Sequence, residues 1–388
     1  MAKTFKFGEN GKWATKTGSS LAFNDQNDNF KPMPFSVTRD SIATRVNKQG
    51  LIEVVGHDKL RIDYKDSSNG VALLEPARTN FITYSEDFSN WYAAYLYVTP
   101  NYALSPDGTQ NASRCLFTGA SQLISTPTSA TGTLTGSMYV KGVAGETIQL
   151  AAGGGEDLIM LNGEWQRLIV TKVNINGIFN INTFGGATAR DLLIWGAQLE
   201  EGSYPTSYIP TSGAAVPREA DVANGAGNSE VFNDSEGVLF VNVAALADDG
   251  TDRVLSLSDG SANNRFVLYY NSSNNLVAQA YSISNSLQAT ITTSNLDITN
   301  FSKAAIKYNS NSIELLVNGF SVETEAVATP PINLSEISYD NGVGGADFYG
   351  NTKEIGYYDA VLTDAELEAL TSYTSFTNMA NELNLTIK

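Results

Sequence analysis

The sequence is short of cysteine, histidine and charged residues. Its 388 residues include one cysteine, Cys115, and one histidine, His57. A single cysteine allows no disulfide within the chain, although a secreted lectin of this size would usually carry some. One cysteine and one histidine cannot supply the usual ligands of a zinc or iron site. A Ser-His-Asp triad would have to use His57, which lies in a turn-like Gly-His-Asp context, and the sequence has no Gly-x-Ser-x-Gly elbow.

Positive charge is also scarce. The 24 Lys and Arg residues face 41 Asp and Glu residues, which gives a net charge of −17. Such a chain cannot follow a phosphate backbone and is repelled by an anionic membrane surface, so we expect no nucleic-acid partner. The sequence has no long apolar run, so we expect no membrane insertion. Its first residues lack an apolar secretion signal, so we expect the protein to be assembled in the cytoplasm of a bacterial host.

The composition that is present is that of packed β domains. Hydrophobic residues make up 42% and aromatic residues 10% of the chain, which excludes general disorder. Charged residues make up only 17%, so Asn, Ser, Thr and Gly must cover the surface. This composition is typical of all-β extracellular and viral proteins, in which turns join many short strands.

Alternating apolar patterns and turns predict five regions in an all-β chain. Residues 1–80 hold short strand candidates between polar turns, with too little apolar mass for a core of their own. We expect them to form an N-terminal docking and oligomerisation region. Residues 81–212 and 233–374 are each predicted to form a jelly-roll-like β-sandwich, joined by a linker at 213–232. Residues 375–388 are predicted to form a C-terminal arm, either a last strand or an interface segment.

Some patterns are specific enough to predict individual elements. Thr133–Lys141 and Ser312–Val317 alternate as strands, and Asn318-Gly319 after the second favours a type I′ hairpin turn. Near the end of the chain, Thr363 and Glu366 form the pattern of a capping box before a short helix. The alternation also predicts that Trp195 and Leu315 are core residues of separate domains.

Several segments resemble known families. The strand and capped helix at 351–370 resemble the end of a laminin-G or concanavalin A-like sandwich. Residues 35–53 (FSVTRDSIATRVNKQGLIE), 61–64, 73–80 and 195–211 resemble segments of tailed-phage structural proteins. Together the resemblance covers about residues 12–370, and the final arm lies outside it. In these families such modules resemble carbohydrate-binding jelly rolls in head fibres, tail fibres and other appendages.

The resemblance implies a non-enzymatic virion protein, a head or tail fibre or appendage with lectin-like domains for adhesion to host surface glycans. The expected partners are other virion proteins through the N-terminal region, two further copies in a homotrimer, and a host cell-surface polysaccharide. One alternative is a purely structural capsid-decoration or fibre-anchoring protein. A weaker alternative is a glycan depolymerase.

Two short stretches are candidates for binding. Trp91, Tyr92, Tyr95 and Tyr97 could form an aromatic platform for sugars, and the alternative is that they pack in a core. Asp248, Asp249 and Asp252 form an oxygen-rich loop that could bind calcium, although acidic turns without metal are common.

No catalytic residue is predicted. Concanavalin-like glycosidases need two opposed carboxylates, and the Glu-x-Asp-x-x-Glu strand that supplies them in one family is absent. The adjacent pairs Glu156-Asp157 and Glu200-Glu201 would point to opposite faces of a strand. We therefore expect no enzymatic activity.

Overall fold

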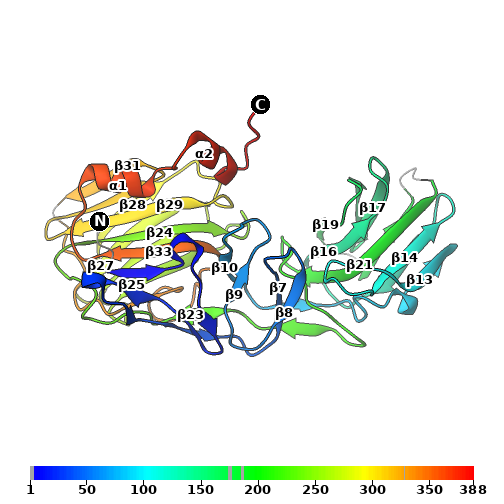
Figure 1. Cartoon of the computed structure of the whole chain (residues 1–388), viewed down its shortest axis with the longest axis horizontal. Helices are drawn as coiled ribbons and strands as arrows, with labels where there is room; N and C mark the ends of the chain where they lie inside the picture. The colour runs from blue at the N-terminus through cyan, green and yellow to red at the C-terminus, as the bar shows by residue number, and fades with distance from the viewer. Residues whose placement is uncertain (1–3, 174–176, 185–187, 327) are drawn as a thin grey trace. The chain divides into compact units, whose positions relative to one another are not determined.

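The chain forms two compact units in the computed structural model, which describes residues 4–173, 177–184, 188–326 and 328–388. The discontinuous unit comprises Met1–Arg39, Gly56–Pro76 and Ala220–Lys388. The inserted unit comprises Asp40–Val55 and Ala77–Glu219, so the chain crosses between the units four times. Strands dominate both units (Figure 1), which confirms the predicted all-β class. None of the described helices is long and apolar enough to cross a membrane.

The discontinuous unit is a sandwich of two antiparallel sheets over one core. The larger sheet contains ten strands: β1 (Phe5–Phe7), β4 (Phe23–Asn24), β5 (Lys31–Pro32), β9 (Arg61–Asp63), β10 (Val71–Leu74), β24 (Gly237–Ala245), β29 (Ser302–Asn309), β30 (Ser312–Val317), β31 (Phe320–Ala326) and β33 (Gly350–Tyr358). The second sheet contains β25 (Arg253–Ser258), β26 (Arg265–Tyr270), β27 (Leu276–Ser282), β28 (Ser286–Thr293) and β32 (Glu336–Ser338). A smaller sheet contains β2 (Thr15–Lys16), β3 (Ser19–Ser20), β6 (Phe35–Thr38) and β23 (Val222–Asn224).

The N-terminal residues are part of this sandwich. Phe5, Phe7 and Phe35 are at most 1% exposed and belong to its core. Strand β1 pairs with β33 near the other end of the chain, with Phe5 opposite Tyr357. The expected boundary at residue 80 therefore differs from the structure, because the apolar residues of the N-terminal region complete a core that is built mainly from residues after 220.

The inserted unit is a second sandwich, made of two five-stranded sheets around its own core. One sheet contains β12 (Tyr92–Ala94), β15 (Leu123–Pro127), β17 (Thr147–Ala152), β18 (Gly155–Met160) and β20 (Ile178–Asn182). The other contains β13 (Leu96–Ala103), β14 (Ala112–Phe117), β16 (Thr133–Lys141), β19 (Gln166–Val173) and β21 (Arg190–Glu201). Two strand pairs complete the unit: β7 (Ala43–Val46) with β8 (Ile52–Val55), and β11 (Arg78–Asn80) with β22 (Val216–Arg218).

The expected linker at 213–232 also differs from the structure. Its first part holds β22, which pairs with β11 in the inserted unit. Its middle holds β23, which pairs with β6 in the discontinuous unit. The segment is therefore built into both units, and the chain crosses between them at Glu219 and Ala220.

Short helices are few, and the capped one was predicted. Helix α1 (Asp364–Thr371) has Thr363 as its N-cap and a complete capping box with Glu366. Its buried Leu367 packs on the outer face of the ten-stranded sheet, against residues that include Phe240 and Leu316. The segment after it forms helix α2 (Phe376–Glu382) rather than a last strand. Three short 3-10 helices lie at Glu9–Gly11, Gln26–Asp28 and Phe88–Asn90.

A buried cluster of four charged side chains lies in the discontinuous unit. Arg39, Arg61, Glu75 and Asp221 are each at most 3% exposed. Asp221 accepts from Arg39 at 2.7 Å and also pairs with Arg61, which is 2.6 Å from Glu75. Arg39 also donates to the backbone oxygen of Gly56 at 2.6 Å. We call these four residues the crossing cluster. Each of the four crossings lies beside one of them or beside Gly56.

Candidate functional site

Three of the four predicted platform aromatics are on the surface of the inserted unit. Tyr92, Tyr95 and Tyr97 are 67%, 84% and 69% exposed. Tyr92 lies on β12, an edge strand of one sheet, and Tyr97 lies on β13, an edge strand of the other. The tyrosines therefore follow the chain as it passes from one sheet to the other, and we call them the tyrosine platform.

The local sequence explains why Tyr97 is exposed. On β13, Leu96 and Val98 pack against the core, so the alternation of the strand sends Tyr97 to the outer face. Tyr95 stands between the two strands with φ of 60°, a left-handed conformation that is uncommon for a bulky residue. Backbone strain of this kind concentrates at functional sites, where it holds a side chain in a set position.

Trp91 does not belong to the platform. It is 6% exposed, and its ring centroid lies 5.0 Å from that of Phe88 and 6.1 Å from that of Phe179 in the core. Its indole nitrogen donates to the backbone oxygen of Tyr84 at 2.9 Å. The packing alternative is the correct one here, because Trp91 follows a 3-10 helix and fills the end of the sandwich.

A charged pair adds polar groups to the outer face near β13. Arg114 donates two hydrogen bonds to Asp191, at 2.7 and 2.6 Å, and these bonds lower the pKa of the Asp191 carboxyl. The Arg114 guanidinium lies 5.1 Å from the ring centroid of Tyr102, which is half exposed. In the ladder between β13 and β14, Arg114 lies opposite Thr99, which is two residues after Tyr97. Aromatic faces beside fixed hydrogen-bonding groups suit a ligand with both apolar and hydroxyl surfaces.

The acidic loop does not assemble a calcium site from the three predicted aspartates. No group of three acidic, histidine or cysteine side chains that could hold a metal ion occurs among the described residues. Asp249 instead accepts from Arg253 at 2.7 Å and from the backbone of Thr251 at 3.1 Å. These bonds outweigh burial and lower the pKa of Asp249. The side chains of Asp248 and Asp252 are not drawn into the same cluster.

The sequence did not predict that the carboxyl groups of Glu336 and Asp340 interact. Burial raises the pKa of Glu336, and the charge of Asp340 raises it further. Burial also raises the pKa of Asp340, although Asn224 donates to this carboxyl at 2.8 Å. Their spacing of four residues gave no signal, because Asp340 lies in a loop after β32 rather than on the strand.

The single histidine and cysteine take no part in a site. His57 lies in an exposed turn, as its sequence context predicted. Cys115 is fully buried in the core of the inserted unit, and burial raises the pKa of its thiol. A polar cavity of about 610 Å³ on the discontinuous unit was not anticipated, because six separate segments line it.

Comparison with known proteins supports the fold of the C-terminal part. Residues 239–368 match the family described as the concanavalin A-like lectin/glucanases superfamily. This segment corresponds to the greater part of the two large sheets of the discontinuous unit together with α1. It confirms the predicted concanavalin A-like sandwich. No protein in a search of curated sequences matches this chain.

Solved structures with a similar arrangement are distant. The CBM40 module of a Ruminococcus gnavus IT-sialidase is 18% identical, with a TM-score of 0.32, and the match covers 38% of this chain and 94% of that module. Domain 4 of the arabinanase AbnA from Geobacillus stearothermophilus, solved with arabinotriose, is 13% identical, with a TM-score of 0.32 and coverage of 44% and 84%. Domains LG4-5 of the mouse laminin α1 chain are 9% identical, with a TM-score of 0.25 and coverage of 74% and 90%.

Proposed function

We propose that the protein is a non-enzymatic glycan-binding protein, and that it serves as a head or tail fibre or appendage of a tailed-phage virion. The observation that carries the binding function is the tyrosine platform, three exposed aromatic rings within six residues at the edge of a sandwich. A single exposed aromatic residue is ordinary, but exposed aromatic residues that lie close together can mark a binding site. The match of residues 239–368 to a lectin-like family supports the same function.

The virion role is supported by the resemblance of residues 35–53, 61–64, 73–80 and 195–211 to tailed-phage structural proteins. Contact with other virion proteins is proposed through the N-terminal region, where Leu21 and Phe30 are 42% and 72% exposed although the neighbouring phenylalanines are buried. The sequence predicts a homotrimer because residues 1–80 have too little apolar mass for a core of their own. Since the strands of this region pack into the sandwich, trimer formation is a separate proposal, and the mass of the protein in solution tests it.

A glycan array tests the binding function. The full chain should bind at least one bacterial surface polysaccharide weakly per site, and binding should strengthen when the chain is clustered on a bead, because avidity multiplies shallow contacts. The combined substitution Tyr92→Ala, Tyr95→Ala and Tyr97→Ala should lower binding by roughly tenfold or more, the equivalent of ~1.4 kcal/mol. Phe320→Ala is the matched control, since Phe320 is 77% exposed in the other unit.

Binding should survive EDTA, because the aspartates of the acidic loop do not gather around an ion. Equal binding by the platform variant and the Phe320 control would remove the tyrosines from the proposal. Failure of the clustered protein to bind any host polysaccharide would replace the adhesin with the structural alternative.

The structural alternative has one observation in its favour. Three charged residues of the phage-like segments, Arg39, Arg61 and Glu75, are buried in the crossing cluster and cannot meet a ligand. These segments therefore have a structural reason to be present in any protein with this chain path. Particles that lack the protein distinguish the two functions, since normal adsorption to host cells would favour a spacer or decoration.

The depolymerase alternative rests on the raised pKa values of Glu336 and Asp340, since a general acid needs a carboxyl that stays protonated. We expect no products when the chain is incubated with the polysaccharide that it binds. Shortened chains that vanish in a Glu336→Gln variant would establish the enzyme instead.

A further inference from the structure

The polar cavity on the discontinuous unit has the size and lining of a ligand site. Its volume of about 610 Å³ lies within the range of about 300–1,000 Å³ that small-molecule sites occupy. Its walls come from residues 8–11, 63–71, 242, 299–303, 351–354 and 374–384. Three of these segments lie outside residues 239–368, so the cavity is not a feature of the matched lectin-like segment alone.

An irregularity in β33 turns two charged side chains toward the cavity. Asn242 of β24 pairs with Glu354, but the next residue of β24 pairs with Thr352, so Lys353 is an extra residue in β33. Thr352 and Ile355 are buried on the core side, which leaves Lys353 and Glu354 together on the outer face. Such bulges commonly redirect side chains at functional sites.

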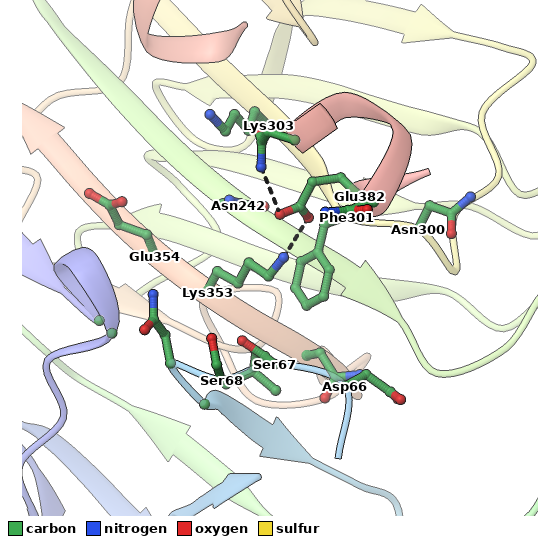
Figure 2. Close-up of a pocket in the computed structure, with 18 of the residues that line it drawn as sticks. Asp66, Ser67, Ser68, Asn242, Asn300, Phe301, Lys303, Lys353, Glu354 and Glu382 are labelled. Carbon is green, nitrogen blue, oxygen red and sulfur yellow. Dashed lines mark hydrogen bonds and ion pairs between the residues drawn. The ribbon is translucent and has the colours of Figure 1, made fainter. Parts of the chain in front are cut away.

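Lys353 already has its charge balanced. Its ammonium group lies 3.8 Å from the centroid of the Phe301 ring and pairs with Glu382 of α2. Figure 2 shows Lys353 extending from β33 with Glu382 and Phe301 beside it. Glu382 in turn accepts from Asn378 at 3.5 Å. Together these contacts hold the C-terminal helix over one side of the cavity.

Asn242 supplies an acceptor that has no partner among the described residues. Its side-chain oxygen is enclosed, and it accepts no hydrogen bond. Asn242 alternates along β24 with core residues Val241 and Val243, so its side chain stands on the outer face and lines the cavity. An enclosed acceptor without a partner destabilises the fold, and a hydrogen bond from a ligand hydroxyl would remove this cost.

The lining favours a neutral ligand with many hydroxyls. Eight asparagines line the cavity, and each amide offers donors and an acceptor together. Four carboxylates, on Asp63, Asp66, Glu354 and Glu382, outnumber the two ammonium groups of Lys303 and Lys353. This balance opposes an anionic ligand. Since no three acidic groups among the described residues gather as metal ligands, it does not build a cation site either.

We infer that this cavity is a second binding site of the protein and that it takes a neutral saccharide, with Asn242 accepting one of the sugar hydroxyls. The inference rests on the proposed glycan-binding function and adds a site on the other unit. A surface platform with a separate polar cavity gives one chain two points of attachment to a polysaccharide, which raises its avidity.

A single engineered thiol tests the site directly. Ser68 is exposed and lines the cavity, whereas the natural Cys115 is fully buried, so Ser68→Cys provides the one accessible thiol. The rate of its alkylation is measured in the full chain with neutral tetrasaccharides of glucose, galactose or mannose, and with a glucuronate-containing tetrasaccharide. At least one neutral sugar should slow alkylation severalfold at millimolar concentration, and the acidic sugar should have a smaller effect.

Two variants in the Ser68→Cys background assign the protection to the cavity. Asn242→Ala should abolish it, and so should Asn381→Ala, which changes an exposed position of α2 and leaves the core intact. Asn263→Ala is the matched control, an exposed asparagine outside the cavity, and it should keep full protection. Absence of protection by every neutral sugar, stronger protection by the acidic one, or full protection in both cavity variants would overturn the inference.

The outcome is distinguishable from that of the proposed function. Protection should persist when the tyrosine platform is replaced by alanine, because the platform lies in the inserted unit. Array binding that depends on the platform, with no protection of the Ser68→Cys thiol, would leave the proposed function standing and remove the cavity site. Protection of the thiol together with array binding that does not depend on the platform would leave the cavity site standing and remove the tyrosines from the proposed function.

Discussion

The crossing cluster shows what a few charged residues do when they are fully buried. Burial would by itself lower the pKa of Arg61, but the charges of Asp221 and Glu75 outweigh it and raise the pKa above its ordinary value. Asp221 also accepts from the backbone nitrogen of Glu75 at 2.9 Å. Each group is thus satisfied only while the others are present.

Asp221→Asn should therefore be strongly destabilising. Removal of one partner leaves the buried arginines without compensation, at a cost of about 3–5 kcal/mol. Urea unfolding measures the loss. Asp191→Asn is the control, since the pair between Arg114 and Asp191 has side chains that are 32% and 49% exposed and should contribute less than about 1 kcal/mol. Equal losses in the two variants would contradict a special role for the cluster.

A pH dependence should come from Glu336 and Asp340. The pKa of each carboxyl is raised in the folded protein, so folding favours the protonated forms. Their contribution to stability is present below their unfolded pKa values and is lost as pH rises through the folded ones. Glu336→Gln removes one of the two negative charges and with it the repulsion between the two carboxylates.

The melting temperature of Glu336→Gln should fall less than that of the parent between pH 4 and pH 7. Glu323→Gln, at an exposed position of β31, should follow the parent. A variant curve parallel to that of the parent would show that the two carboxyls do not interact in the way their pKa shifts indicate.

At the scale of elements, the segments with a strong local signal were predicted well. β16 and β30 have the bounds that their alternation predicted. Asn318 and Gly319 have φ of 50° and 91°, the left-handed pair that a type I′ turn requires. The capping box was visible because its two residues are three positions apart.

Elements that depend on distant partners were not predictable in this way. β1 pairs with β33, and nothing in residues 5–7 identifies a strand about 350 positions later. Alternation along β13 predicts that the side chains of Leu96 and Tyr97 lie on opposite faces of the strand, but it does not say which of the two faces the core. Trp91 follows a 3-10 helix, where a period of two does not apply. The cavity combines loops and a helix from both ends of the chain, so no local pattern contained it.

Helix α1 allows a test of local signal against packing. Thr363→Ala removes the cap and should cost about 1 kcal/mol. Leu367→Ala, at the fully buried contact with the sheet, should cost about 2–5 kcal/mol. Glu368→Ala, at an exposed position of the same helix, is the control. Denaturant midpoints check the order, and a larger loss from the cap than from Leu367 would mean that packing does not hold the helix.

At the scale of the whole molecule, the two units should respond independently to core damage. Trp195 is buried in the inserted unit and Leu315 in the discontinuous unit, as predicted. Each change to alanine should cost roughly 2–5 kcal/mol. The losses should add within ~0.5 kcal/mol in the double variant, because the sites share no partner. Calorimetry measures the two transitions, and strong coupling between them would argue for one cooperative body.

Removal of residues 1–35 should unfold the discontinuous unit and leave the inserted unit folded. The deletion takes away β1 and the buried rings of Phe5, Phe7 and Phe35, which pack against Phe232 and Tyr339. A docking region outside both sandwiches, as the sequence predicts for residues 1–80, could instead be removed with both sandwiches left folded. Calorimetry should show one transition in place of two. A truncated chain that keeps both transitions would restore the docking-arm interpretation.

The crossing cluster also sets an order of events during translation. Arg39 is synthesised 182 positions before its partner Asp221. At about 5–20 residues per second, the ribosome takes roughly 10–40 s to make the residues between them. The inserted unit is complete before that interval ends and can fold on the nascent chain. The first 39 residues must wait through it without Phe232 and Tyr339, against which Phe5 and Phe35 pack. They join a sandwich only after the last strands have left the ribosome.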